Sequence, residues 1–209
     1  MTKKKILFKP GTMHGNVVLN FRNSPESEFG HYAEEFHNAG KLLAQRIKRS
    51  RNYSDLQACP IVFLYRHALE LYLKDIVMVG NWFIQSSGAT PIVKTEDIGS
   101  HGLARLAPAL KQAFDTVGWD WKIDVAYMKT EKEFEVLLKE IDAIDPLSQS
   151  FRYPTKRNGE ASVSKHFLFS ILEFSKTLDP ILDMLDSASA GLRAQWDNYA
   201  EALYESQHV

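Results

Sequence analysis

The 209-residue sequence contains a single cysteine, Cys59, and this scarcity excludes two kinds of site. One cysteine cannot form an internal disulfide, and it cannot supply the paired thiolates of a CxxC metal or redox motif. No apolar run reaches about 18 residues, the length that a membrane-spanning helix needs. Residues 1–10 hold three consecutive lysines and a short apolar piece, too little for a signal peptide. We therefore expect a cytoplasmic protein with no membrane contact.

The net charge of -1 indicates no polyanionic partner for the chain as a whole, but the charge is unevenly distributed. Residues 1–51 carry ten Lys and Arg against four Asp and Glu, a balance of +6, which leaves -7 for the remainder. We interpret this as a basic first helix lying against acidic later helices, and a nucleic-acid-binding patch is the less favoured alternative. Hydrophobic residues at 44% predict an ordinary globular core.

Residues 60–80 form the most apolar segment and are expected to be the central helix of the fold. Ser54 to Gln57 resembles a capping box before it, so the helix either bends at Pro60 or begins near Cys59. At 100° per residue, four polar side chains share one narrow stripe on this helix. These are Arg66, His67, Glu70 and Lys74.

Other segments show apolar residues at spacings of three and four, which predict further helices. The expected helices begin at Ser24, Ser100, Thr130 and Ser164, and the helix from Thr130 ends at Asp145-Pro146. The helix from Ser164 either kinks or restarts at Asp179-Pro180. A last helix covers 191–207.

The rest of the chain is expected to be extended or loop-like. Residues 1–23 read as an extended N-terminal arm, residues 80–100 as a long loop, and Asn158-Gly159 predicts a short β-hairpin near 150–164. The fold class is therefore all-α: an antiparallel bundle of about five to six helices forming a single domain over 24–209.

The polar stripe is the first candidate site. Glu70 is four residues from both Arg66 and Lys74, so its carboxylate can bridge two cations. A solvated helix face and a buried or cleft-facing network are both consistent with this spacing. In a cleft, His67 would be the acid/base candidate, and Arg66 or Lys74 would bind an anion. His101, at an expected helix start, is either a second candidate or a packing residue.

The second candidate is the loop that contains Arg152, Tyr153, Lys156 and Arg157. Such side chains can bind a phosphate or a carboxylate through charge-assisted hydrogen bonds. Alternatively, Arg152 can pair with Glu70 across the fold. A plain hairpin with solvated basic residues is the competing interpretation.

The first helix carries metal-ligand residue types at His31, Glu34, Glu35 and His37. The two histidines are six positions apart and do not share a helix face well, so no metal is expected. The sequence has no glycine-rich phosphate loop, no GxSxG elbow and no HExxH motif, and no cofactor is expected.

The segment Arg66 to Lys74, which reads RHALELYLK, resembles the HEPN-like helical-bundle proteins of prokaryotes. A later H-x-L-x-x-L, here His101, Leu103 and Leu106, and the segment 148–154 are similar to the same group. The resemblance covers about residues 30–185. It implies an all-α bundle, commonly dimeric, in a superfamily rich in ribonuclease toxins and phage-defence components.

The ribonuclease motif of that superfamily, an arginine followed after four to six residues by a histidine, does not occur here. We therefore expect a protein that binds RNA, a nucleotide or a partner protein in a defence, toxin-antitoxin or stress setting, without the standard nuclease site. One alternative is an atypical metal-independent endoribonuclease whose composite site uses His67 or His101. The other is a non-catalytic homodimerisation scaffold.

Overall fold

The computed structural model describes residues 28–50, 52–121, 125, 128–163 and 166–207, together with residues 7, 12, 14 and 17. Within these residues it contains five α-helices and no β-strand, so the expected all-α class is confirmed. Most of the predicted N-terminal arm lies outside the described residues. The helices are α1 (Phe29–Arg49), α2 (Ala58–Ser86), α3 (Ala107–Thr116), α4 (Glu131–Ile144) and α5 (Ile171–Gln207).

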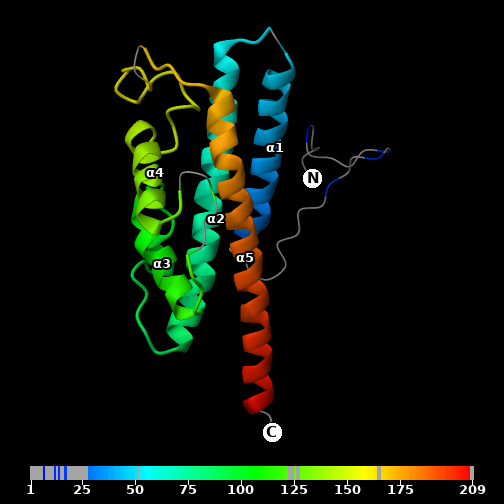
Figure 1. Ribbon diagram of the computed structural model, residues 1–209, viewed down its shortest axis with the longest axis vertical. Helices are drawn as coiled ribbons and strands as arrows, with labels where there is room; N and C mark the ends of the chain where they lie inside the picture. Colours follow the sequence, from blue (N-terminus) through cyan, green and yellow to red (C-terminus); the bar gives the residue numbers. More distant parts are fainter. Residues whose placement is uncertain are drawn as a thin grey trace, which may run out of the picture.

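Helix α2 occupies the middle of the bundle, with α1 and α5 on one side and α3 and α4 on the other (Figure 1). Helix α1 runs antiparallel to α2, whereas α5 runs parallel to it. Tyr65 bonds to Asp179 and Tyr72 to Asp186, a constant separation of 114 positions that only parallel helices can keep. The bundle is therefore not antiparallel throughout, because α4 already returns the chain to the end where α2 begins, and segment 145–170 connects α4 to α5 at that end.

Helix α2 begins at Ala58, next to Cys59, which is the second of the two predicted alternatives, and the capping box predicted over Ser54–Gln57 does not form. Ser54 accepts a hydrogen bond from the Leu56 backbone N–H and starts a 3-10 turn over Asp55–Gln57, which leads directly into α2. Pro60 then falls in the first turn, where its missing N–H breaks no helical bond. Twenty residues of α2 are buried, as expected for a helix that is apolar on most faces.

The loop predicted over 80–100 starts later than expected, because α2 continues to Ser86. Gly80, which suggested a break, is a packing residue instead. A Cβ atom at this position would clash with the Cβ of Ala113 on α3, so glycine permits the close approach of the two helices. The aromatic residues Trp82 and Phe83 consequently lie on the last turns of α2 rather than in a loop.

Helices α3 and α4 form the second side of the bundle. The predicted start of α4 at Thr130 is confirmed by a capping box, in which Thr130 accepts from the Glu133 N–H and Glu133 accepts from the Thr130 N–H. The helix ends before Asp145-Pro146, as predicted. Ser100, in contrast, caps no helix, because a 3-10 turn over Ala104–Leu106 precedes α3.

Helix α5 joins two segments that the sequence suggested were separate. It begins at Ile171 rather than Ser164 and continues through Pro180 to Gln207. Pro180 is exposed, so water can bond to the carbonyl that the missing N–H leaves without a helical partner. The C-terminal part of α5 extends past the ends of α2 and α3 (Figure 1).

The predicted β-hairpin is reduced to a single antiparallel bridge between Thr155 and Ala161. Its turn contains Gly159 at φ +83°, a conformation that glycine adopts without strain. The first helix begins at Phe29, and the predicted cap at Ser24 lies outside the described residues. No helix of the described chain has both the length and the apolar content that crossing a membrane demands.

Candidate functional site

The polar stripe of α2 is a buried network with the Glu70 carboxylate at its centre. Glu70 accepts from Arg66 Nη1 at 2.8 Å and from Lys74 Nζ at 2.6 Å, and its Oε1 lies 2.9 Å from His101 Nδ1. Only 1% of Arg66, 1% of Glu70 and 6% of Lys74 is exposed. Of the two interpretations that the sequence left open, the structure has the buried network.

Arg66 connects this network to the end of α4 and to the loop before α3. Its Nε donates to the Asp145 carbonyl at 3.1 Å, and its Nη2 donates to the His101 carbonyl at 2.9 Å. The Asp145 carboxylate lies 3.4 Å from Nε, and Asp142 lies 4.0 Å from Nη2. Arg66 therefore ties three segments together from inside the fold.

The two aspartates also accept hydrogen bonds from backbone N–H groups that belong to no α-helix. Asp142 accepts from Leu103 and Ala104, and Asp145 accepts from Gln149 and Ser150. Each carboxylate fixes the start of a connecting segment relative to α4. The network thus has the properties of a structural clamp, because its charges and donors are matched by groups within the chain.

The environment of Glu70 supports this interpretation. Burial alone would raise its pKa, but the hydrogen bond and charge of Lys74 and the hydrogen bonds from His101 and Arg66 outweigh burial and lower the pKa. Glu70 is therefore ionised at neutral pH and neutralises the two cations beside it. Arg66 and Lys74, both predicted to bind an anion, already hold carboxylate partners.

His67 lies on α2 beside this network but has different neighbours. Its ring stacks on Phe63 with centroids 5.5 Å apart and meets the edge of Phe36 at 4.5 Å. Burial lowers its pKa, so the imidazole is neutral at pH 7. The structure thus separates the two candidate histidines: His67 packs among rings, and His101 bonds to Glu70.

Arg152 does not bond to Glu70, whose three partners are Arg66, Lys74 and His101. Its guanidinium lies over two rings, 5.3 Å from the centroid of Phe63 and 5.5 Å from that of Tyr153. Phe63 is the same ring on which His67 stacks. We call this surface the Arg152 patch; it consists of Phe36, Phe63, His67, Arg152 and Tyr153.

The remaining predicted loop cations lie on the turn that follows the patch. Arg157 is exposed between the bridged residues Thr155 and Ala161. Lys156 is also exposed and lies 3.9 Å from Glu160. The structure thus brings Arg152 and Tyr153 together with His67, and it leaves Arg157 on the outer surface of the same loop.

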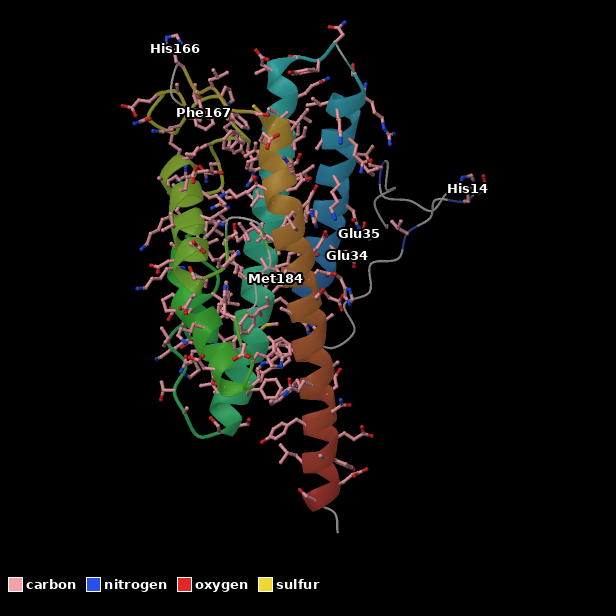
Figure 2. The ribbon with its side chains drawn as sticks, in the orientation of Figure 1. His14, Glu34, Glu35, His166, Phe167 and Met184 are labelled. Carbon is pink, nitrogen blue, oxygen red and sulfur yellow. The ribbon has the colours of Figure 1, made fainter. Side chains whose placement is uncertain are left out.

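The metal-ligand types on α1 serve other purposes. His37 is buried, with its Nε2 3.1 Å from Asp179 of α5, while Glu34 and Glu35 are exposed on α1 (Figure 2). Burial is the largest influence on His37 and lowers its pKa. In the part of the chain that the structure describes, no group of three or more His, Cys, Asp or Glu residues is arranged to hold a metal ion.

Sequence reasoning missed a ladder of polar contacts between α2 and α5. Besides the two Tyr–Asp bonds already described, the fully buried Asp75 accepts from Ser189 Oγ at 2.6 Å and pairs with Arg193. A signal exists: Asp179 and Asp186 are seven residues apart, as are Tyr65 and Tyr72. Equal seven-residue spacing lets both side-chain pairs form across one helix interface, although it fits either helix direction.

Comparisons with known proteins assign no family to this chain. No protein-family model matches it, and neither does any curated protein or any solved structure. The site must accordingly be interpreted from its own geometry.

Proposed function

We propose that this protein is a HEPN-like binding module that takes a phosphate-bearing ligand, RNA or a nucleotide, at the Arg152 patch. The observation that carries the proposal is the guanidinium of Arg152, which lies over two aromatic rings. Among the described residues, no carboxylate pairs with it. The setting we propose is defence, toxin-antitoxin function or stress in the cytoplasm, and the all-α architecture is what a HEPN-like protein would have.

The chemistry of the patch suits such a ligand in two ways. A guanidinium held by the faces of rings keeps the N–H groups at its edge available, and these match phosphate oxygens in a bidentate geometry. Tyr153 is 52% exposed, and its ring offers a surface on which a base can stack. The buried network of Arg66, Glu70 and Lys74 supplies rigidity beneath the patch rather than a binding group.

The test is a titration of the intact protein against a fluorescein-labelled single-stranded RNA and a labelled nucleotide, followed by anisotropy. Arg152→Met keeps much of the aliphatic stem and removes the charge. We expect this variant to bind RNA about tenfold or more weakly, the effect of losing roughly 1–3 kcal/mol of stacking and phosphate contact. We also expect a shallower dependence of binding on salt.

Lys132→Met is the matched control. It removes one positive charge from an exposed residue in the first turn of α4, whereas the patch loop follows the last turn of the same helix. We expect it to bind RNA like the unmodified protein. The proposal fails if Arg152→Met and Lys132→Met have the same affinity, or if neither RNA nor nucleotide binds.

The endoribonuclease alternative uses the same preparation. His67 is neutral, partly exposed and close enough to Arg152 for that charge to lower its pKa further, so it has the protonation state of a general base. Incubation with total RNA and chelator, beside His67→Ala, tests this alternative. Chelator-resistant cleavage that the variant abolishes would replace binding with catalysis as the function.

A second candidate, the homodimerisation scaffold, is favoured by the end of α5. Near its C-terminal end this helix exposes 37% of Tyr199, whose ring also contacts Phe83 of α2, and 40% of Leu203, which is four residues further on the same face. A second copy of this face would cover both side chains. Sedimentation equilibrium tests the proposal: Leu203→Asp should shift a dimer to monomer, and a monomeric unmodified protein would refute it.

A further inference from the structure

A cavity of about 340 Å³ lies between the first turns of α5, the second half of α4 and the beginning of α2. Phe151, Phe167, Phe169 and Ser170 of the segment between α4 and α5 also line it, and Figure 2 shows Phe167 on that segment, with His166 at the outer edge. This cavity is separate from the Arg152 patch, although the two are adjacent in sequence. Phe151 lines the cavity, whereas the guanidinium of Arg152 lies over the ring of Phe63.

Four phenylalanine rings make up much of the wall. Phe151 and Phe167 have centroids 6.3 Å apart, Phe167 and Phe169 are 5.1 Å apart, and Phe169 and Phe174 are 6.2 Å apart. Aliphatic side chains of α4, such as Ile141, complete the apolar surface. A concave wall of this kind favours a ligand with an apolar body.

The charges around the cavity decide the sign of the ligand's polar end. Glu140, Asp145 and Glu173 line it, against a single cation, Arg66. Arg66 pairs with Glu70 and lies 3.4 Å from Asp145, so Asp145 is compensated inside the buried network. Among the described residues Glu140 has no cation partner, and Glu173 has only the exposed Lys176, 3.4 Å away. The positive end of the α5 dipole also borders the cavity, but Glu173 lies in the first turn of that helix and opposes it. The net field therefore favours a cation.

We propose that this cavity binds a small molecule with an apolar body and one positively charged group, that is, a hydrophobic amine. The body would fill the space among the phenylalanine rings, whose faces attract cations. The ammonium group would lie at the exposed carboxylates of Glu140 and Glu173, where it keeps contact with water. This site adds a second ligand to the protein and does not depend on RNA or nucleotide binding.

The test compares three ligands of nearly the same shape: phenylbutylammonium, phenylbutanol and phenylbutyrate. Each is titrated by calorimetry into the full-length protein at pH 7. We expect the ammonium compound to bind most tightly, the alcohol more weakly and the carboxylate most weakly. The proposal is overturned if none of the three binds, if the alcohol binds as tightly as the ammonium compound, or if the carboxylate is preferred.

Two exposed substitutions then assign the charge preference to the proposed groups. We expect Glu140→Gln combined with Glu173→Gln to weaken the ammonium compound about five- to tenfold and to leave the alcohol unchanged. Glu201→Gln, an exposed residue near the end of α5, is the control and should bind all three ligands normally. If the double variant and this control bind the ammonium compound with the same affinity, the assignment of the charge preference to Glu140 and Glu173 is overturned.

A third variant tests the location independently of charge. Leu137→Trp replaces a half-buried aliphatic side chain on α4 by a bulkier indole ring, which would fill part of the cavity. We expect it to reduce binding of both the ammonium compound and the alcohol at least tenfold while the circular dichroism spectrum remains that of the unmodified protein. Retained binding in a folded Leu137→Trp protein would place the ligand elsewhere and contradict the proposal.

Discussion

The buried carboxylate of Glu70 makes the clearest stability prediction. Replacing it by glutamine preserves the shape of the side chain and removes its negative charge. Arg66 Nη1 and Lys74 Nζ, now 2.8 and 2.6 Å from the carboxylate oxygens, would then be two buried cations without their counterion. One of them would also face an amide NH₂ group, which cannot accept a hydrogen bond.

The magnitude follows from the burial of this group. Glu70 is 1% exposed, so water does not screen the loss, and breaking a buried pair of this kind costs about 3–5 kcal/mol. That is a large share of the roughly 5–15 kcal/mol that stabilises a typical domain. The exposed pair Glu135–Lys139 has the same i,i+4 spacing, and for Glu135→Gln we expect less than about 0.5 kcal/mol.

Urea unfolding followed by circular dichroism measures both variants against the unmodified protein. If Glu70→Gln does not fold, Lys74→Met provides a milder perturbation, because Glu70 would keep Arg66 and His101 as partners. For this variant we expect a loss of about 1–3 kcal/mol. A free energy of unfolding for Glu70→Gln that equals that of Glu135→Gln would refute the reasoning and make the stripe an ordinary solvated face.

Two further predictions concern pH and packing. Because burial lowers the pKa values of His37 and His67, the unfolded chain binds more protons than the native state near pH 6. Unfolding free energies measured by urea should therefore rise from pH 5 to pH 7, less steeply in His37→Gln. Gly80→Ala should destabilise by about 1–3 kcal/mol in thermal unfolding despite its better helix propensity, and adding Ala113→Gly should restore part of the loss.

The central helix illustrates what local sequence patterns can predict. The i,i+4 spacing of Arg66, Glu70 and Lys74 is a property of one helix, and the predicted contacts among them are all present. The partners of Arg66 beyond this helix were not predictable in the same way. Asp145 lies 79 positions away, and only the complete fold determines that the end of α4 reaches this point.

Errors arose where one residue type has two structural uses. Gly80 suggested a loop because glycine is common in turns, whereas here it allows two helices to approach. Pro180 suggested an interruption because proline removes a helical hydrogen bond, yet its exposed position allows α5 to continue. In both cases the neighbouring helix or the solvent decides between the alternatives, and neither is visible in a local window of sequence.

In the candidate site, too, the sequence predicted local neighbours correctly but not the contacts between distant segments. The sequence placed Arg152 and Tyr153 together on one loop, but it offered Glu70 as the partner of Arg152. The structure places Arg152 over Phe63 instead, because Arg66, Lys74 and His101 already surround the carboxylate. The four-phenylalanine cavity left no local signal, because its rings come from α5 and the segment before it, while its aliphatic wall comes from α4.

The most direct test of the account measures RNA affinity and unfolding free energy together in Arg152→Met and Lys74→Met. The account predicts opposite effects: Arg152→Met binds RNA at least about tenfold more weakly with unchanged stability, and Lys74→Met loses about 1–3 kcal/mol of stability with unchanged RNA affinity. Unchanged RNA binding by Arg152→Met, or weakened binding by a folded Lys74→Met protein, would contradict the assignment of binding to the Arg152 patch and of stability to the buried network.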